Sequence, residues 1–436
     1  RAPTPDSGLE LDGILTMKAE VAAFTHDMEE ISGLCEQWGL KLPLRSHKRL
    51  FGGYSGSNYR VEAADGSVAV LKICHGYDRA EVEAQARIMA HLRAGGFDGA
   101  CLALPLSHGL ISKLATALGL GGGERFVALA RDGSPACLLT FVEGVAADKV
   151  IRTKHVPCEK VLWAVGEGLG RMHSVLCPPG AGLRSILDGG GCDLRKHVSD
   201  VYGDSVSSCA AIAGHDFLPF YWAQREKLRA DLAADGLPQG PLHGDPFLDN
   251  VLVDASTGEL RGFVDFEDVC VGPLIFDVAC CAAAACFRAG DNAFDVRRLR
   301  ALLGGYDAVR QLTAKEAEQL VGFMQIALLC NCAWRFKNFN VDHRELSDCR
   351  DAHRELQQRI EDLDEGSFTA GAIEDTLDNI RRARSEGKVM RSFTSATGSS
   401  ADAELLHGRR WVHIAAAAAA LFTTGLLVMH APLRRG

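Results

Sequence analysis

The chain has 436 residues, which exceeds the size of a typical single domain and predicts more than one lobe. Hydrophobic residues make up 47% and charged residues 24%, a globular composition that excludes a wholly disordered chain. The formal net charge of −9 argues against nucleic acid as the main partner, because phosphate backbones bind basic faces. The 15 cysteines include no C-x-x-C pair, so we expect reduced thiols in a cytoplasmic-type setting.

Short strands dominate the first third of the chain. Residues 59–63 and 67–73 are strand-like and flank Ala64-Asp65-Gly66, which predicts a hairpin because glycine tolerates a positive φ at the turn. Over this third we expect helices at 27–38 and 78–93, and hairpins at 59–73 and 125–141. The chain before it, residues 1–25, is predicted to be an N-terminal tail.

Helices dominate after Gly144, and two short strands, 251–254 and 260–265, interrupt them. The expected helices are 159–176, 217–234, 276–287, 315–337 and 348–363. The predicted fold class is therefore α+β with two lobes. A small antiparallel-sheet N-lobe spans residues 26–143, and a larger, mainly helical C-lobe spans residues 144–385.

The last fifty residues differ from the rest in composition. Residues 386–409 are rich in Ser, Thr and Gly, which predicts a flexible linker. Residues 411–433 contain no Asp, Glu, Lys or Arg and are long enough to cross a bilayer core of about 30 Å. We expect residues 410–436 to form a C-terminal membrane anchor, the alternative being an amphipathic or packed helix.

The segment from His243 to Asn250 carries the most specific pattern. Asp245 is followed five residues later by Asn250 and then by an apolar strand. In phosphoryl transfer a carboxylate must lie beside the attacking hydroxyl, while an amide oxygen reaches a metal ion. A second carboxylate, Asp265, ends the next short strand, and the tight connection 255–259 would bring it beside Asn250. Asn250 and Asp265 would form an oxygen-only site suited to Mg²⁺.

The N-lobe contains a matching set of nucleotide-binding candidates. Residues 51–59 form a Gly/Ser-rich hairpin in which backbone N–H groups could close over phosphates, with Gly53, Ser55, Ser57 and Asn58 as the contacts. Lys72 lies in an otherwise apolar strand, where burial is costly unless the ammonium group meets an anion. We expect Lys72 to meet the phosphates of ATP.

A helix carboxylate is the expected second partner of Lys72. Glu83 is the first choice, and Glu81 is an alternative. Phe141 and Glu143 would belong to the hinge between the lobes, whose backbone could bind adenine.

Together these motifs resemble the aminoglycoside phosphotransferase and choline kinase-like family over residues 45 to 365. The resemblance implies a protein-kinase-like fold in which Asp245 is the catalytic base and Asn250 and Asp265 bind Mg²⁺. It also implies structural roles for His243, in the catalytic loop, and for Asp277, in the D-x-A motif that braces this loop. In the resemblance, Gln85 occupies the place where some family members have the glutamate that pairs with the strand lysine.

Within the family, the chain is most similar to type II homoserine kinases, on motifs such as residues 276–279 and 305–310. Lys72 is a departure, because bacterial homoserine kinases of this type often lack the strand lysine. An amino-acid substrate needs a cation for its carboxylate, for which we expect Arg335, and acids for its ammonium group. Asp249 and Glu267, or Asp268, are the candidates for the acids.

The sequence therefore predicts an ATP- and Mg²⁺-dependent kinase for the hydroxyl of a small amino-containing metabolite, with homoserine as the leading case. Alternative acceptors are hydroxylysine, choline-like alcohols and aminoglycosides. A membrane-tethered pseudokinase scaffold is less favoured, because Lys72, Asp245, Asn250 and Asp265 are all present. No partner protein is inferred.

Overall fold

The computed structural model describes residues 26–50, 56–107, 125–177, 192–194, 214–232, 236–344, 346–365 and 369–386. All of them belong to one compact unit, Arg1–Phe393. The predicted tail, the predicted linker beyond residue 386 and the predicted anchor lie outside these ranges. Within the ranges, no helix combines the length and the apolar character that crossing a membrane requires.

A five-stranded antiparallel sheet forms the N-lobe, in the order β1-β2-β3-β5-β4. The strands are β1 (Ser46–Leu50), β2 (Gly56–Glu62), β3 (Val68–Cys74), β4 (Val127–Leu129) and β5 (Pro135–Thr140). The predicted hairpin is confirmed: β2 and β3 join through Gly66, whose φ of 87° is readily adopted by glycine.

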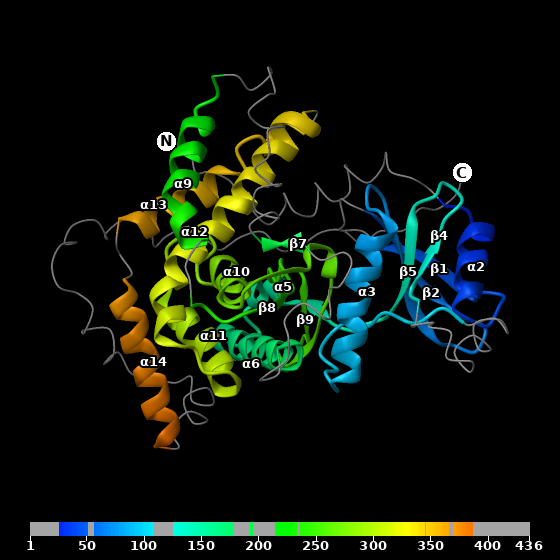
Figure 1. The fold of residues 1–436 in the computed structure, drawn as a ribbon, viewed down its shortest axis with the longest axis horizontal. Helices are drawn as coiled ribbons and strands as arrows, with labels where there is room; N and C mark the ends of the chain where they lie inside the picture. Colours follow the sequence, from blue (N-terminus) through cyan, green and yellow to red (C-terminus); the bar gives the residue numbers. More distant parts are fainter. Residues whose placement is uncertain are drawn as a thin grey trace, which may run out of the picture. The chain divides into compact units, whose positions relative to one another are not determined.

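Two helices cover the two faces of this sheet (Figure 1). Helix α2 (Met28–Gln37) buries Ile31 in one cluster with Leu71, and helix α3 (Arg79–Ala94) buries Ile88 in another cluster with Cys137. Side chains alternate between the faces of a strand, so Lys72, the neighbour of Leu71, lies on the α3 face. Lys72 therefore lies on the side of the sheet that α3 covers.

Helices make up most of the C-lobe, as predicted. They are α5 (Ala147–Thr153), α6 (Cys158–Leu176), α9 (Phe217–Leu232), α10 (Ile275–Ala285), α11 (Val296–Val309), α12 (Ala314–Lys337), α13 (Arg354–Asp364) and α14 (Ala370–Ser385). The described part of the lobe also contains three short helices, η3 (Phe266–Asp268), η4 (Asn338–Asp342) and η5 (Ser347–Cys349). Helices α5, α11 and α14 were not expected.

Glycines explain why α11 escaped prediction. An added Cβ at Gly166 of α6 would lie 2.1 Å from the backbone oxygen of Leu302, and one at Gly305 of α11 would lie 2.1 Å from that of Trp163. The two helices therefore touch backbone to backbone along part of their length. Glycine lowers intrinsic helix propensity, but this tertiary contact outweighs the local preference.

Two small sheets of the C-lobe position the catalytic loop. Strand β8 (Gln239–Leu242) enters the loop and pairs with β11 (Cys270–Pro273), which also pairs with β7 (Cys192–Asp193). The loop leads into β9 (Val251–Val253), which pairs with β10 (Leu260–Phe263) and with β6 (Val145–Ala146). The two ends of residues 243–265 are thus tied to neighbouring strands.

Candidate active site

The loop that follows β8 is closed by the side chain of Asn250. Its amide nitrogen Nδ2 donates to the backbone oxygen of Asp245 and to the carboxylate oxygen Oδ2 of Asp245, both at 3.0 Å. Gly244 enters the loop with a φ of 87°, and a Cβ there would lie 1.9 Å from the backbone oxygen of Asp268. Only glycine fits between His243 and Asp245 without displacing that neighbour.

Asp265 reaches the same loop from the end of β10. The backbone N–H of Val264 donates to the carbonyl of Asn250 at 2.9 Å, so Asp265 follows directly after a residue bonded to the loop. Its backbone is left-handed, with φ 64° and ψ 70°. Such a conformation is uncommon outside glycine and is concentrated at functional sites. The predicted approach of Asn250 and Asp265 is what the structure shows.

Carboxylates gather around Asp245. Burial, followed by the negative charges of Asp268 and Asp249 and then of Asp265, raises the pKa of Asp245 well above its ordinary value. Like charges crowded in a partly buried site favour the binding of a cation or a proton. A perturbed carboxyl group with identified charged neighbours is a mark of a functional site.

Lys72 is the principal cation of this site among the described residues. Its ammonium nitrogen lies 2.7 Å from Oδ1 of Asp265 and 2.6 Å from Oε1 of Glu267, and its side chain is 8% exposed. Burial alone would lower the pKa of Lys72, but these two carboxylates raise it well above its ordinary value. Burial likewise opposes ionisation of Asp265, yet Lys72 lowers the pKa of this carboxyl group.

The predicted pairing of Lys72 with helix α3 is wrong. The carboxylate of Glu83 instead accepts the backbone N–H of Phe126, at 3.3 and 3.5 Å. Glu81, the alternative, accepts the backbone N–H of Asp78 at 2.8 Å in the capping box that starts α3. The orientation of the helix turns both acids away from Lys72, which sequence spacing alone could not show.

Asp277 holds the backbone of the loop at His243 and Gly244. Fully buried in α10, its carboxylate accepts the backbone N–H groups of His243 at 2.8 Å and Gly244 at 3.0 Å. Burial lowers the pKa of His243, so its ring is neutral and Nε2 donates to the carbonyl of Val264 at 3.0 Å. These are the contacts that structural roles for Asp277 and His243 require.

A buried chain of hydrogen bonds, which sequence reasoning did not predict, extends this support. His173 of α6 lies 3.0 Å from Oδ2 of Asp277 through Nε2 and 2.8 Å from the hydroxyl of Tyr306 through Nδ1. Arg310 donates to the same hydroxyl at 3.0 Å and to Glu316 at 2.9 Å. Since the Asp277 carboxylate can only accept a hydrogen bond, His173 donates to it from Nε2. The Nδ1 atom of His173 then accepts the hydrogen bond of the Tyr306 hydroxyl.

The glycine-rich hairpin is only partly described. Gly53 and Ser55 lie outside the described residues. Asn58 faces Lys72 in the register of β2 and β3, so the two share one face of the sheet. The predicted side-chain role of Ser57 is wrong: it lies on the opposite face, fully buried, with Oγ 3.2 Å from Nε2 of His75.

The hinge candidates follow the end of β5. Phe141 is 37% exposed and its ring lies under the guanidinium of Arg60, 5.3 Å from its centroid. Glu143 is exposed as well. The backbone before them is already occupied, because the N–H of Thr140 donates to the carbonyl of Leu102 at 2.9 Å. The adenine contact of residues 141–143 stays a prediction.

The substrate candidates separate into two groups. Asp249 and Asp268 lie close enough to Asp245 to raise its pKa. Glu267 pairs with Lys72. Arg335 is not placed to serve as expected: it donates to the carbonyl of Ala352 at 3.2 Å and pairs with Glu355 at 3.5 Å. Its long side chain extends over the surface of α12. Arg335 thereby connects α12 to α13 and to the segment that precedes α13.

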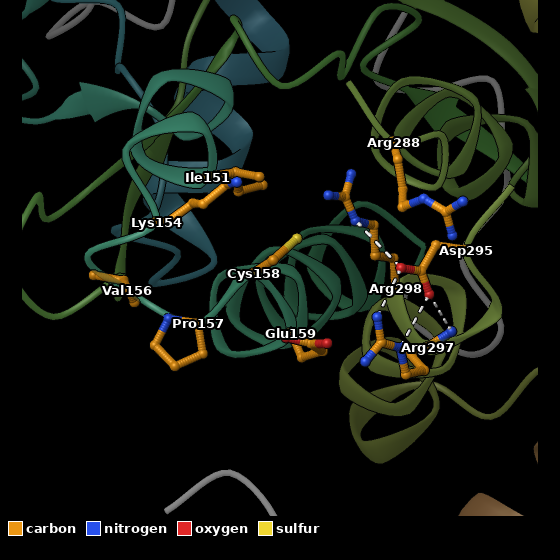
Figure 2. A pocket seen from close by; sticks show the side chains of 10 residues that line it. All are labelled: Ile151, Lys154, Val156, Pro157, Cys158, Glu159, Arg288, Asp295, Arg297 and Arg298. Carbon is orange, nitrogen blue, oxygen red and sulfur yellow. Dashed lines mark hydrogen bonds and ion pairs between the residues drawn. The ribbon is translucent and has the colours of Figure 1, made fainter. Parts of the chain in front are cut away.

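A separate open cavity of about 250 Å³ lies between α5, α6 and α11 (Figure 2). Figure 2 shows Arg297 and Arg298 turned toward Asp295, the N-cap residue of α11, at 3.2 and 3.9 Å. The cavity includes none of the predicted catalytic residues. Arg297 and Arg298 are therefore paired with the carboxylate that caps α11, and the cavity is distinct from the candidate active site.

The donor set fits a hard divalent cation. Asn250 uses Nδ2 for its bonds to Asp245, which leaves its amide oxygen for a metal ion, and Asp265 offers its second carboxylate oxygen. Oxygen ligands of this kind suit Mg²⁺. Within the described residues, no group of three or more His, Cys, Asp or Glu side chains forms a self-contained metal cage. A cation here would share its coordination with a phosphate ligand.

Residues 46–312 match the phosphotransferase enzyme family, which covers more than half of the chain. The chain belongs to this family, and the resemblance stated from the sequence is confirmed.

Curated relatives refine this assignment. The chain is 35% identical to a homoserine kinase of Beijerinckia indica over 43% of this chain and 53% of that protein. It is 30% identical to a homoserine kinase of Brucella anthropi over 67% of this chain and 78% of that protein. The chain spans about half the length of the first of these relatives.

Solved structures agree on the fold. An amicoumacin kinase in complex with AMP-PNP and Ca²⁺ superimposes with a TM-score of 0.57 at 14% identity, covering 77% of this chain and 94% of that one. An aminoglycoside 2'-phosphotransferase in complex with GDP gives 0.53 at 12% identity, over 78% and 97%. At these identities the likeness concerns the fold, and it confirms the predicted bilobal kinase-like architecture.

Proposed function

We propose that the protein is an ATP- and Mg²⁺-dependent kinase that phosphorylates the hydroxyl group of a small amino-containing metabolite, homoserine first. The observation that carries the proposal is the convergence of Asp245, Asn250, Asp265 and Lys72 on one site. Separate segments, 193 residues apart for Lys72 and Asp265, supply these groups. Each would have a role in phosphoryl transfer.

Asp245 is the group that meets the acceptor. Asn250 holds its Oδ2, so the carboxylate is oriented before the substrate arrives. Its raised pKa makes it a stronger base than an ordinary aspartate, which suits it to receive the proton of the attacking hydroxyl. The main contributions to the rate would come from positioning and from charge stabilisation.

Lys72 and the oxygen ligands act on the nucleotide side. Lys72 would neutralise the charge of the nucleotide phosphates, since its ammonium group is buried and charged. Asn250 and Asp265 would hold Mg²⁺, which when bound neutralises charge on the phosphates. The neighbours are complexes with AMP-PNP and Ca²⁺ or with GDP, which supports nucleotide binding by this fold.

Homoserine is favoured as acceptor by curated relatives that are named homoserine kinases, at 28–35% identity. The acids near Asp245 support a cationic substrate, because Asp249 and Asp268 could hold an ammonium group. The substrate carboxylate requires a cation other than Arg335, whose guanidinium is engaged with α13.

The acceptor is tested by a screen of the purified chain with ATP and Mg²⁺. Homoserine, hydroxylysine, choline, ethanolamine and kanamycin would be compared, with ³¹P NMR identifying the phosphorylated product. We expect ADP and a phosphomonoester signal with homoserine, and neither with Asp245→Ala. Turnover of another acceptor in preference would replace homoserine, and no acceptor-dependent ADP would contradict the kinase proposal.

The membrane anchor over residues 410–436 stays a proposal, because this segment lies outside the described residues. A fluorescent reporter fused to residues 397–436 tests it. Membrane-localised fluorescence would support the anchor, and a diffuse signal would contradict it.

A further inference from the structure

Helix α3 leaves Lys72 without a helix carboxylate. Glu81 is committed to the N-terminal cap of the helix, and Glu83 accepts the backbone N–H of Phe126. The next position on the inward side is Gln85, an amide that is 7% exposed. An amide cannot balance the buried charge of Lys72, so the stabilising carboxylate must come from another element.

Glu267 supplies that carboxylate. Its Oε1 lies 2.6 Å from the ammonium nitrogen of Lys72, and its side chain is 10% exposed. The hydroxyl of Tyr77 donates to its Oε2 at 3.4 Å. The amide nitrogen of Gln85 donates to the backbone oxygen of Glu267 at 3.2 Å. Contacts from β3, α3 and the turn between them therefore hold Glu267 in place.

We propose that Glu267 is the positioning residue of Lys72 and takes over the role expected of a carboxylate on α3. The proposal rests on the proposed function, in which Lys72 binds nucleotide phosphates. Asp265, the other carboxylate on Lys72, is there a metal ligand, so Glu267 is the partner that can hold the ammonium group while nucleotide is bound.

Gln85 has a matching role in this arrangement. Because it bonds to the backbone of Glu267 rather than to Lys72, it couples α3 to the segment after Asp265 by a neutral hydrogen bond. The position of α3 then affects Lys72 through Glu267, not through a direct ion pair.

Three variants test the proposal, each measured for AMP-PNP affinity by calorimetry and for the KM values of ATP and the acceptor. Lys72→Met measures how much AMP-PNP affinity is lost when the cation is removed. Glu267→Gln removes one charge from its partner, and Glu83→Gln is the matched control on α3. We expect Lys72→Met and Glu267→Gln to weaken AMP-PNP binding about 10- to 100-fold, as for a lost charge-assisted contact. Glu83→Gln should bind within about twofold of the wild type.

The outcomes separate the two proposals. Normal AMP-PNP affinity in Lys72→Met would contradict the proposed function itself. A loss in Lys72→Met with normal affinity in Glu267→Gln, or a larger loss in Glu83→Gln, would overturn the role of Glu267 alone. An equal loss of ATP and acceptor affinity in Glu267→Gln would indicate a merely structural role and would also overturn it.

Glu267→Asp covers the case in which Glu267→Gln does not fold. It keeps the charge but shortens the side chain by one methylene group. We expect a selective rise in the KM of ATP that is smaller than that of Lys72→Met, with the KM of the acceptor unchanged. An unchanged KM for ATP in a folded Glu267→Asp would contradict the proposal.

Discussion

Buried carboxylates occur in two regions of the C-lobe, and the two regions treat them differently. Beneath the catalytic loop, Asp277, Glu316 and Asp307 are each 0–1% exposed and each matched by hydrogen-bond donors. In the active site, Asp245 is surrounded by Asp249, Asp265 and Asp268. The lower region is balanced within the protein, whereas the site has an excess of negative charge.

This difference separates acids that stabilise the fold from acids that act in a functional site. A buried carboxylate with a complete set of donors stabilises the fold, because its desolvation is offset by hydrogen bonds. Carboxylates crowded around one another repel, and this repulsion favours the binding of a cation or a proton. The proposed Mg²⁺ ion would relieve the repulsion around Asp245.

The largest expected effect is on activity, from Asp245→Asn. Loss of a general base lowers kcat by about 10²- to 10⁴-fold, while the amide keeps the size of the side chain. Steady-state kinetics with the best acceptor measures this loss. Because the change removes a crowded charge, the melting temperature should stay the same or rise. Wild-type turnover, or a marked drop in melting temperature, would place Asp245 with the structural acids.

Asp277→Asn is expected to have the largest effect on stability. An amide in this place accepts on one side only, so at least one of the N–H groups of His173, His243 and Gly244 loses its partner. An unsatisfied buried donor costs about 1–3 kcal/mol. Urea unfolding followed by circular dichroism measures the loss. A variant as stable as the wild type would show that Asp277 does not hold the loop.

Asp307 gives a prediction that depends on pH. Burial alone would raise its pKa, but Arg381 and Arg384 of α14 lower it below the ordinary value. A depressed carboxyl pKa stabilises the folded state above the unfolded pKa of about 3.9, and this stability is lost as pH falls through the folded value. Asp307→Asn should therefore be less stable than the wild type at pH 7.

The difference between Asp307→Asn and the wild type should shrink below about pH 4, where the Asp307 carboxyl group of the unfolded chain begins to take up a proton while that of the folded protein is still ionised. Thermal unfolding at pH 7, 5 and 3.5 measures it. Equal stability of the two proteins at pH 7 would show that the pairing with α14 contributes nothing.

The smallest effect is expected from Tyr306→Phe. The change removes the hydroxyl between His173 and Arg310, while Arg310 keeps Glu316 and His173 keeps Asp277. A loss of about 1 kcal/mol in unfolding free energy is typical of one such hydrogen bond. Activity should fall less than in Asp245→Asn. A loss of activity as large as that of Asp245→Asn would instead place Tyr306 in the chemistry.

The sequence predicted the catalytic loop well because its pattern is local. His243 to Asn250 and the short strands around it are close in sequence, so spacing alone indicated that Asn250 and Asp265 would approach each other. The helical C-lobe and the β2–β3 hairpin followed from periodicity and turn residues.

The remaining features depend on contacts between distant segments. Lys72 pairs with Glu267, which lies 195 residues further along the chain (residue 72 to residue 267). Neither this contact nor the rotation of α3 about its axis can be read from residue spacing. Arg335 was misassigned because a long side chain can turn to either face of its surroundings. His173 was missed because it appears alone in an ordinary helix pattern. Tyr306 lies within the 305–310 motif, but its contact with His173, 133 residues away in the chain, is not visible in that motif.

The most direct test of the central claim is the dependence of AMP-PNP binding on Mg²⁺, measured by calorimetry for the wild type and Asp265→Asn. The account predicts tight binding by the wild type only when Mg²⁺ is present, and weak binding by Asp265→Asn with or without it. Equal, Mg²⁺-independent affinity in both proteins would contradict the proposal that Asn250 and Asp265 bind a divalent cation together with its nucleotide.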